Sequence, residues 1–304
     1  MTVLPAPSNP FARRRPPAGT SSGAVSRPPW WREALIVAWL AWIYDLLTGY
    51  APLRAHAAIS NAWGIWHAET AVHLDPELGL NRWLARHHEL SQIASYYYDN
   101  AHFLVTFGLL GLLWWRLPAD YRPLRSSLAL VNVIAFVVFW LYPLAPPRML
   151  TSVGFFDVVG HSNTFGQWHT GTLATSADQF AAMPSLHVSW ALWCTLAVWR
   201  LTANRLLRAL GVVYPLLTAL VIFSTGNHFL FDALGGIGAM VLALLLVWCA
   251  EAVLAGRRAG ARAELAPRAV VGGQMPPAQG AASPRGDAVP LSWLNGTEGN
   301  RLPR

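Results

Sequence analysis

The sequence predicts an all-α integral membrane protein: a bundle of six transmembrane helices with an interfacial helical segment between spans one and two. Of the 304 residues, 54% are hydrophobic and only 12% are charged, and 16 are Trp. This is far more apolar than an average soluble domain. Six apolar stretches approach the roughly 20 residues that a helix needs to cross a bilayer. The basic residues, all Arg, cluster near the termini and in short loops between these stretches, which is typical of membrane topology.

The N-terminal part of the chain begins with a polar segment. Residues 1–29 are rich in Pro, Ser, Gly and Arg and lack apolar periodicity, which predicts a disordered tail. The first span is expected over residues 31–50. Residues 51–90 combine scattered apolar residues with many Trp and His, which predicts one or two helices lying at the membrane interface. Within them, Glu69 can be either solvated or functional.

The middle of the chain contains two further spans, expected over residues 92–115 and 127–142. Prolines stop the third span at residues 143–147. A long loop then runs to Met183, and its length would allow it to cover a site. The loop between the two spans carries three basic residues, Arg116, Arg122 and Arg125.

The last three spans are expected over residues 185–199, 210–223 and 232–252. A second polar segment, residues 254–304, is rich in Ala, Gly, Pro and Arg and predicts a disordered tail. The predicted organisation is therefore a six-span catalytic membrane domain, residues 30–253, between two disordered tails.

The arginine distribution predicts the orientation in the cell membrane. With six spans both termini lie on one side, and 18 of the 22 basic residues fall on that side. Cytoplasmic segments carry such an excess, so the termini are expected in the cytoplasm. The formal charge of +7 therefore reflects topology, and no nucleic-acid partner is predicted. The loops that carry Arg148, His187 and His228 are expected to meet at the extracytoplasmic face.

The most informative motif is a histidine and a carboxylate, His228 and Asp232, four residues apart where the sixth span begins. Four residues is about one helical turn, so the carboxylate can reach the imidazole and fix its tautomer. A histidine held in this way is prepared to act as a nucleophile or base. The alternative is that His228 lies at the headgroup level and Asp232 caps the helix.

Phosphate is the substrate chemistry that the surrounding residues favour. Spans two, four and six start on the outer side, and their helix N-termini are natural anion sites. Ser185 and Asn227 are placed to cap spans four and six, and Arg148 offers a planar fork for phosphate oxygens. His228 would then attack phosphorus, and His187 would protonate the departing alkoxide.

No metal or other cofactor is predicted. The sequence offers no evident carboxylate cage for Mg²⁺. The ten histidines include no H-x-x-x-H or H-E-x-x-H spacing. This agrees with a route through phosphohistidine.

Three segments carry a resemblance to a known family: YPLAPPRML, AAMPSLHVSW and STGNHFLFDALGG. Their order over residues 30–250 resembles the phosphatidic acid phosphatase type 2 superfamily, and their details resemble its inositol phosphorylceramide synthase-like (aureobasidin-resistance-like) branch. The resemblance implies that His228 is the nucleophile, Asp232 its orienting acid and His187 the general acid. Arg148 would be the phosphate-binding arginine of the first motif.

Two residues depart from the phosphatase pattern. Leu186 replaces the glycine usual between serine and histidine, and Ile222 stands where an arginine is usual six residues before the nucleophile. Both departures favour the synthase-like branch. They also leave the charge of the transferred group to Arg148 and the helix N-termini.

Three residues at the start of the second span, Tyr98, Asp99 and His102, are candidates to line the site. Ionisable groups in a span are costly unless they face protein or water. The alternative is an aromatic belt with a satisfied histidine.

The predicted function is that of a lipid phosphate phosphatase or phosphotransferase. The first alternative is a transferase of the inositol phosphorylceramide synthase-like kind, which moves a phosphoryl headgroup to a lipid or polyol acceptor. The second, from another class, is a nonenzymatic lipid carrier. Carriers generally have polar residues at mid-depth, and the spans here are poor in midplane charge. The predicted partners are a lipid phosphate and the bilayer, while the sequence gives no indication of the oligomeric state.

Overall fold

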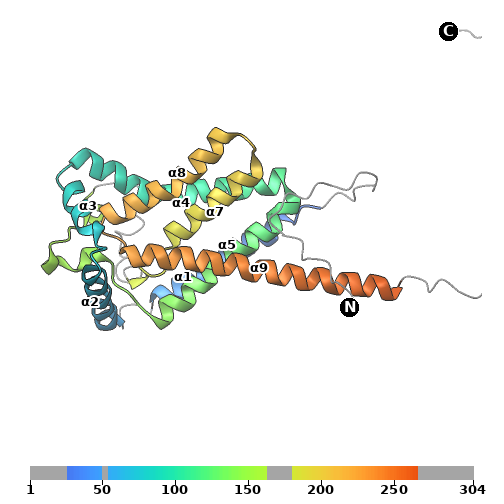
Figure 1. Ribbon diagram of the computed structural model, residues 1–304, viewed down its shortest axis with the longest axis horizontal. Coiled ribbons are helices and arrows are strands. Elements are labelled where there is room, and N and C mark those ends of the chain that lie inside the picture. The colour runs from blue at the N-terminus through green and yellow to red at the C-terminus, as the bar shows by residue number, and fades with distance from the viewer. Residues whose placement is uncertain (1–25, 50–53, 163–179, 266–304) are drawn as a thin grey trace, which may run out of the picture. The chain divides into compact units, whose positions relative to one another are not determined.

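The computed structural model describes residues 26–49, 54–162 and 180–265, and within these ranges the regular elements are helices. The chain divides into two units, Met1–Ala259 and Gly260–Arg304, and everything below lies in the first except the end of α9. Figure 1 shows the arrangement of the helices. In chain order they are α1 (Trp30–Gly49), α2 (Ala55–Ala71), α3 (Pro76–Leu84), α4 (His88–Arg116), α5 (Pro118–Leu141), α6 (Val158–His161), α7 (Leu186–Leu201), α8 (Arg205–Ser224) and α9 (Leu230–Leu265). Two short 3-10 turns, η2 (Pro147–Met149) and η3 (Thr151–Val153), lie between α5 and α6.

Among the described residues, three helices are long and apolar enough to cross a membrane: α5, α8 and the Leu230–Ala261 part of α9. The all-helical, membrane-protein prediction is therefore confirmed, but the count of six spans is not. Helix α7 has 16 residues, which corresponds to about 24 Å, shorter than the roughly 30 Å hydrocarbon core. Helices α1 and α4 are not among these three.

Two element boundaries differ from the prediction. Helix α5 begins at Pro118, so Arg122 and Arg125 lie inside a helix instead of a loop. Proline at the first helical position is pre-set for the helix, which explains the early start. Helix α9 continues to Leu265 into the segment predicted to be disordered, because Ala, Arg and Leu there are strong helix formers. The remainder of both predicted tails lies outside the described residues, apart from residues 26–29.

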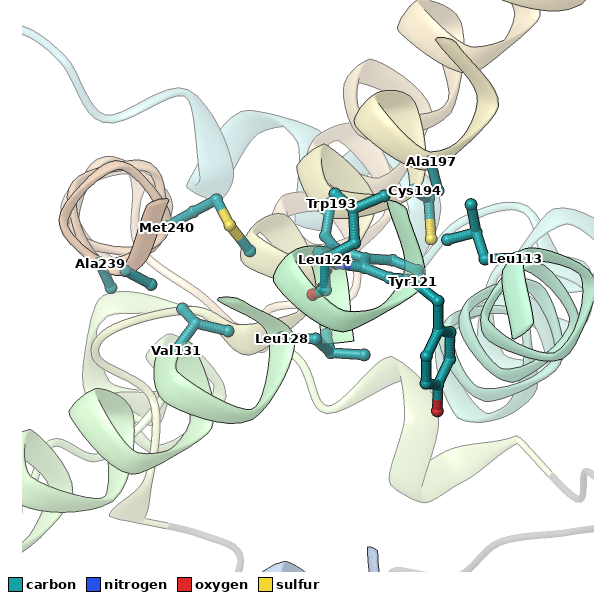
Figure 2. Close-up of a cluster of buried hydrophobic side chains, with 11 residues drawn as sticks. Leu113, Tyr121, Leu124, Leu128, Val131, Trp193, Cys194, Ala197, Ala239 and Met240 are labelled. Carbon is teal, nitrogen blue, oxygen red and sulfur yellow. Dashed lines mark hydrogen bonds between the residues drawn. The ribbon is translucent and has the colours of Figure 1, made fainter. Parts of the chain in front are cut away.

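The largest core cluster joins α4, α5, α7 and α9 around the buried indole of Trp193 (Figure 2). Its Nε1–H donates to the carbonyl oxygen of Leu124 at 2.8 Å, so the one polar atom of this side chain is satisfied. Helix α1 packs on α5, where Glu33 accepts from the Tyr121 hydroxyl and pairs with Arg125. These contacts hold the long helices side by side.

Helices α2 and α3 lie at the end of the bundle where α9 begins (Figure 1). In α2, the buried residues Trp66 and Ala62 belong to a second core cluster that includes Phe229, just before α9. In α3, the buried Asn81 donates to the carbonyl of Ser224 at the end of α8 and bonds both backbone groups of Phe156. The predicted interfacial segment is thus packed into the fold around the start of α9.

A close crossing of α9 and α7 sets the position of the candidate site. The Ser189 hydroxyl donates to Gly236 O at 2.8 Å, and Ser185 N–H donates to Asp232 O at 2.9 Å. A Cβ on Gly236 would lie 2.4 Å from Ser185 O, which is backbone and cannot swing aside. Only glycine permits this approach.

We expect Gly236→Ala to lower the thermal midpoint of the purified protein by several degrees, because the helices must move apart. Gly238→Ala is the matched control, since a Cβ there meets nothing within 4 Å. Alanine is the better helix former, so the control should be neutral or slightly stabilising. Equal midpoints for the two variants would contradict the close-packing explanation.

Candidate active site

His228 lies in the turn between α8 and α9. Helix α8 ends at Ser224, and the N–H groups of Asn227 and His228 both donate to Ile222 O, at 3.1 and 3.3 Å. Gly226 has φ +73°, and a Cβ there would lie 2.9 Å from Asn81 Nδ2. Glycine therefore allows the left-handed turn and the close approach of α3. The backbone of this turn therefore fixes the position of His228.

The His228 ring has a defined tautomer. Its Nδ1 lies 3.0 Å from Ala182 O and 3.4 Å from Asp232 Oδ2. A carbonyl oxygen can only accept, so Nδ1 carries a proton, and in the neutral ring Nε2 presents its lone pair. The ring is almost fully buried, with 5% of the residue exposed. This is the state that a nucleophilic histidine requires.

The lone pair of His228 points to His187 in the first turn of α7. His228 Nε2 and His187 Nδ1 are 3.4 Å apart, and the ring centroids are 5.5 Å apart at 64°. The segment before α7 is held by Leu144, whose N–H and C=O bond the backbone of Phe180 and Ala182. The two histidines predicted to act together are therefore in contact.

Helix α4 contributes two rings to this group. Tyr98 stacks on His187 with centroids 4.6 Å apart, and His102 meets His187 edge-on at 4.5 Å. Asp99 is fully buried on a neighbouring stripe of the helix that it shares with Ser95 and Thr106. The flank of α4, not its N-terminus, faces the site, because α4 begins at His88, about 15 Å along the axis from Tyr98. The predicted meeting of three helix N-termini is wrong for α4.

Arg148 packs against the turn that holds His228. Its N–H donates to Gly226 O at 2.8 Å, its Nη1 donates to Asn227 Oδ1, and its Nε lies 3.6 Å from Asp157 Oδ2. The structure does not show the predicted capping role of Asn227, because its Oδ1 accepts from Arg148 and its Nδ2 donates to Thr225 Oγ1 at 2.9 Å. Asn227 instead fixes the arginine beside the histidine.

The first turn of α9 is capped by two carboxylates. Asp232 Oδ2 accepts from Phe229 N–H at 2.8 Å, and Glu69 Oε1 from α2 accepts from Phe231 N–H at 2.6 Å. Asp232 therefore both caps the helix and contacts His228, so the cap and the contact with the imidazole do not exclude each other. Free N–H groups at a helix start need such partners. The side chain of Phe229, the residue before α9, has no oxygen that could cap the helix. Glu69 from α2 supplies a capping oxygen instead.

The sequence pattern leaves the role of Glu69 open and suggests none for Glu77. The signal was present in the spacing, because each carboxylate continues a buried stripe of its helix. A carboxylate in line with buried residues predicts burial, and buried carboxylates need a partner. The stripes are Ala58, Ala62, Trp66 and Glu69 in α2, and Glu77, Asn81 and Leu84 in α3.

Ser185 precedes the first residue of α7 and is fully buried. Its side chain makes no bond to the helix, and among the described residues its hydroxyl has no hydrogen-bond partner. Of the two uses expected for it, the structure does not show the helix cap. Over the same residues, no group of three or more His, Cys, Asp and Glu side chains is arranged to hold a metal ion.

Comparison with protein families identifies the group to which this site belongs. A model of the PAP2 superfamily matches residues 63–246, from α2 to α9 and including every candidate site residue. The chain belongs to the PAP2 superfamily. Comparisons with curated proteins and with solved structures find no match. PAP2 membership indicates a lipid-phosphatase-type function, while the inositol phosphorylceramide synthase-like branch stays a prediction.

Proposed function

We propose that this PAP2 protein is a phosphatase or phosphotransferase of lipid phosphates that acts through a phosphohistidine on His228. The observation that carries the proposal is the polarised ring: Nδ1 is bound by Ala182 O and Asp232, and Nε2 faces His187. Both histidines lie at the same end of the bundle. The arginine distribution supports placing that end outside the cell membrane, with the termini in the cytoplasm.

The first half-reaction transfers the phosphoryl group to the enzyme. The Nε2 lone pair forms a bond to phosphorus as the phosphorus–oxygen bond to the leaving group breaks, and His187 gives that oxygen a proton. Asp232 stabilises the positive charge that develops on the His228 ring. His228 Nε2 and His187 Nδ1 are 3.4 Å apart, which leaves no room for a phosphate between the two rings. In the proposed reaction the His187 side chain therefore turns aside when the phosphate binds.

The negative oxygens of the phosphate are met by three groups. The Ser185 hydroxyl and the N–H groups at the start of α7 lie beside His187. Arg148 uses Nη1 and Nε for Asn227 and Asp157, which leaves Nη2 to a phosphate oxygen. No arginine stands at position 222, where Ile222 packs with Val188 in a core cluster. Arg148 is therefore expected to be the main cationic contact.

The second half-reaction distinguishes hydrolysis from transfer. Water attacking the phosphohistidine releases phosphate, whereas an acceptor hydroxyl forms a new phosphoester. Leu186 and Ile222 favour the second outcome through their likeness to the inositol phosphorylceramide synthase-like branch. This transferase is the second candidate function.

The test is to incubate the purified protein in detergent with phosphate-labelled lipid phosphate, with and without inositol or diacylglycerol. A phosphatase is expected to release labelled phosphate in both cases. A transferase is expected to form a labelled product only when its acceptor is present. No chemical product under either condition would contradict the proposal and favour a nonenzymatic carrier.

A further inference from the structure

Two buried acids lie behind the His228–Asp232 pair and have no part in the reaction described above. Glu69 in α2 and Glu77 in α3 are both 0% exposed. Their carboxyl groups lie beside each other and near Asp232. Charged groups this deep are costly to bury without compensation, so their presence needs an explanation.

Glu69 connects this pair to the helix that carries Asp232. Its Oε1 accepts from Phe231 N–H, one residue before Asp232. When both groups are ionised, Glu69 Oε2 and both oxygens of Glu77 have no hydrogen-bond partner among the described residues. A bond between the two adjacent side chains therefore requires one of them to keep its proton and donate it to the other.

The ionisable groups around Glu69 and Glu77 are themselves acids. Asp232 faces both groups from α9, Asp75 faces Glu77 from the residue before α3, and Tyr142 lies near Asp232. Two adjacent carboxylates cannot both ionise in such surroundings. Burial, reinforced by Glu77, raises the pKa of Glu69 to about 10, and burial also raises the pKa of Glu77. The pair therefore retains a proton near neutral pH.

We propose that Glu69 and Glu77 are positioning residues for His228 and Asp232, sharing one proton so that the pair fixes the first turn of α9 and places one negative charge behind Asp232. The inference rests on the proposed function. The protonated Glu69 holds the first turn of α9 in position through its bonds to Phe231 N–H and Glu77, and this role is called the frame below. The ionised Glu77 supplies the charge, which favours the positive ring of a phosphohistidine.

Three variants separate the frame from the charge. Glu69→Gln keeps an oxygen for Phe231 N–H, a donor for Glu77 and the charge of the pair. Glu77→Gln keeps an acceptor for Glu69 but removes the charge. Glu69→Leu removes the frame. The matched control is His67→Gln, an exposed position on the same helix.

Thermal stability tests proton sharing without any assay of activity. The folded pKa of Glu69 is about 10 against an ordinary value of 4.5. Its stabilising contribution is therefore complete below about pH 4.5 and is lost as pH rises toward 10. The glutamine of Glu69→Gln cannot ionise, so the thermal midpoint of this variant should rise relative to that of the native protein as the pH increases from 5 to 9. Glu69→Leu should be lower than both by roughly 5 °C or more at pH 5.

Kinetics test the charge. In Glu77→Gln, kcat should fall about tenfold, and the acidic limb of the kcat/KM profile should move to lower pH by roughly one unit, because a negative charge near His228 is lost. Glu69→Gln and His67→Gln should stay within about twofold of the native protein with unshifted profiles. A simple packing role would predict equal effects of the two glutamine variants.

The inference is overturned if the Glu69→Gln midpoint runs parallel to the native one across pH, or if Glu69→Gln and Glu77→Gln shift the kinetic profile equally. If the native protein shows no turnover that depends on His228, the proposed function fails, and the stability comparison still decides whether the pair shares a proton. If Glu69→Leu does not fold, the two glutamine variants carry both comparisons.

Discussion

Replacing His228 with alanine is expected to reduce turnover of a lipid phosphate by roughly 10⁴-fold or more, because the proposed nucleophile of the reaction is removed. The ring is buried, but it packs in a turn held by Gly226 and by Ile222 O, bonds that the backbone makes. The variant should therefore fold. Loss of activity with a native thermal midpoint is the expected combination.

The measurement is single-turnover trapping of label on the protein. The native enzyme should carry a label that survives base and is lost in acid, as a phosphoryl–histidine bond does, and His228→Ala should carry none. His187→Ala should label more slowly, by about 10²-fold to 10⁴-fold, because the leaving oxygen lacks its acid.

The matched control is His161→Ala, since His161 is exposed in α6 on the loop that follows Arg148. It is expected to label and turn over like the native protein. Turnover that persists in both His228→Ala and His187→Ala would remove the phosphohistidine mechanism.

The sequence predicted the helical class and the meeting of His228, His187 and Arg148, because these features depend on local patterns. Apolar runs determine helices, and a four-residue spacing at a helix start allows Asp232 to reach His228. Contact between His187 and His228 followed from placing both loops on one side. The structure brings these residues together at the distances given above.

Contacts that depend on packing between distant segments could not be predicted in the same way. Ala182 O binds His228 only because the strand-like segment before α7 pairs with Leu144. Asn227 was expected at a helix cap, but the fold places Arg148 where it captures the side chain. Backbone acceptors and partner choice of this kind have no signature in a single sequence.

The interfacial segment shows a second limit. A low apolar content and many aromatic residues predicted helices lying on the membrane, and two helices are present. Yet α2 and α3 also deliver Glu69 and Asn81 to the two ends of the His228 turn. Composition indicates where a helix can lie, while the identity of its few buried polar residues determines what it holds in place.

Asp232→Asn is expected to lower kcat by about 10²-fold or more while the protein stays folded. Asp232 Oδ2 serves both Phe229 N–H and the Nδ1–H of His228, and the amide oxygen of asparagine can accept both bonds. Tautomer and helix cap are then kept, and only the charge is lost. The rate loss measures how much that charge stabilises the positive ring in the transition state.

Asp232→Ala removes the cap as well, so it should lose at least as much activity and also lower the thermal midpoint by several degrees. Glu251→Gln, a carboxylate near the far end of the same helix, is the matched control and should change neither quantity. Stopped-flow labelling separates the steps: slow labelling with a normal second step assigns the charge to phosphohistidine formation. If Asp232→Asn labelled at the native rate, the negative charge needed by the His228 ring would have to come from elsewhere, and among the described residues Glu69 and Glu77 also lie near Asp232.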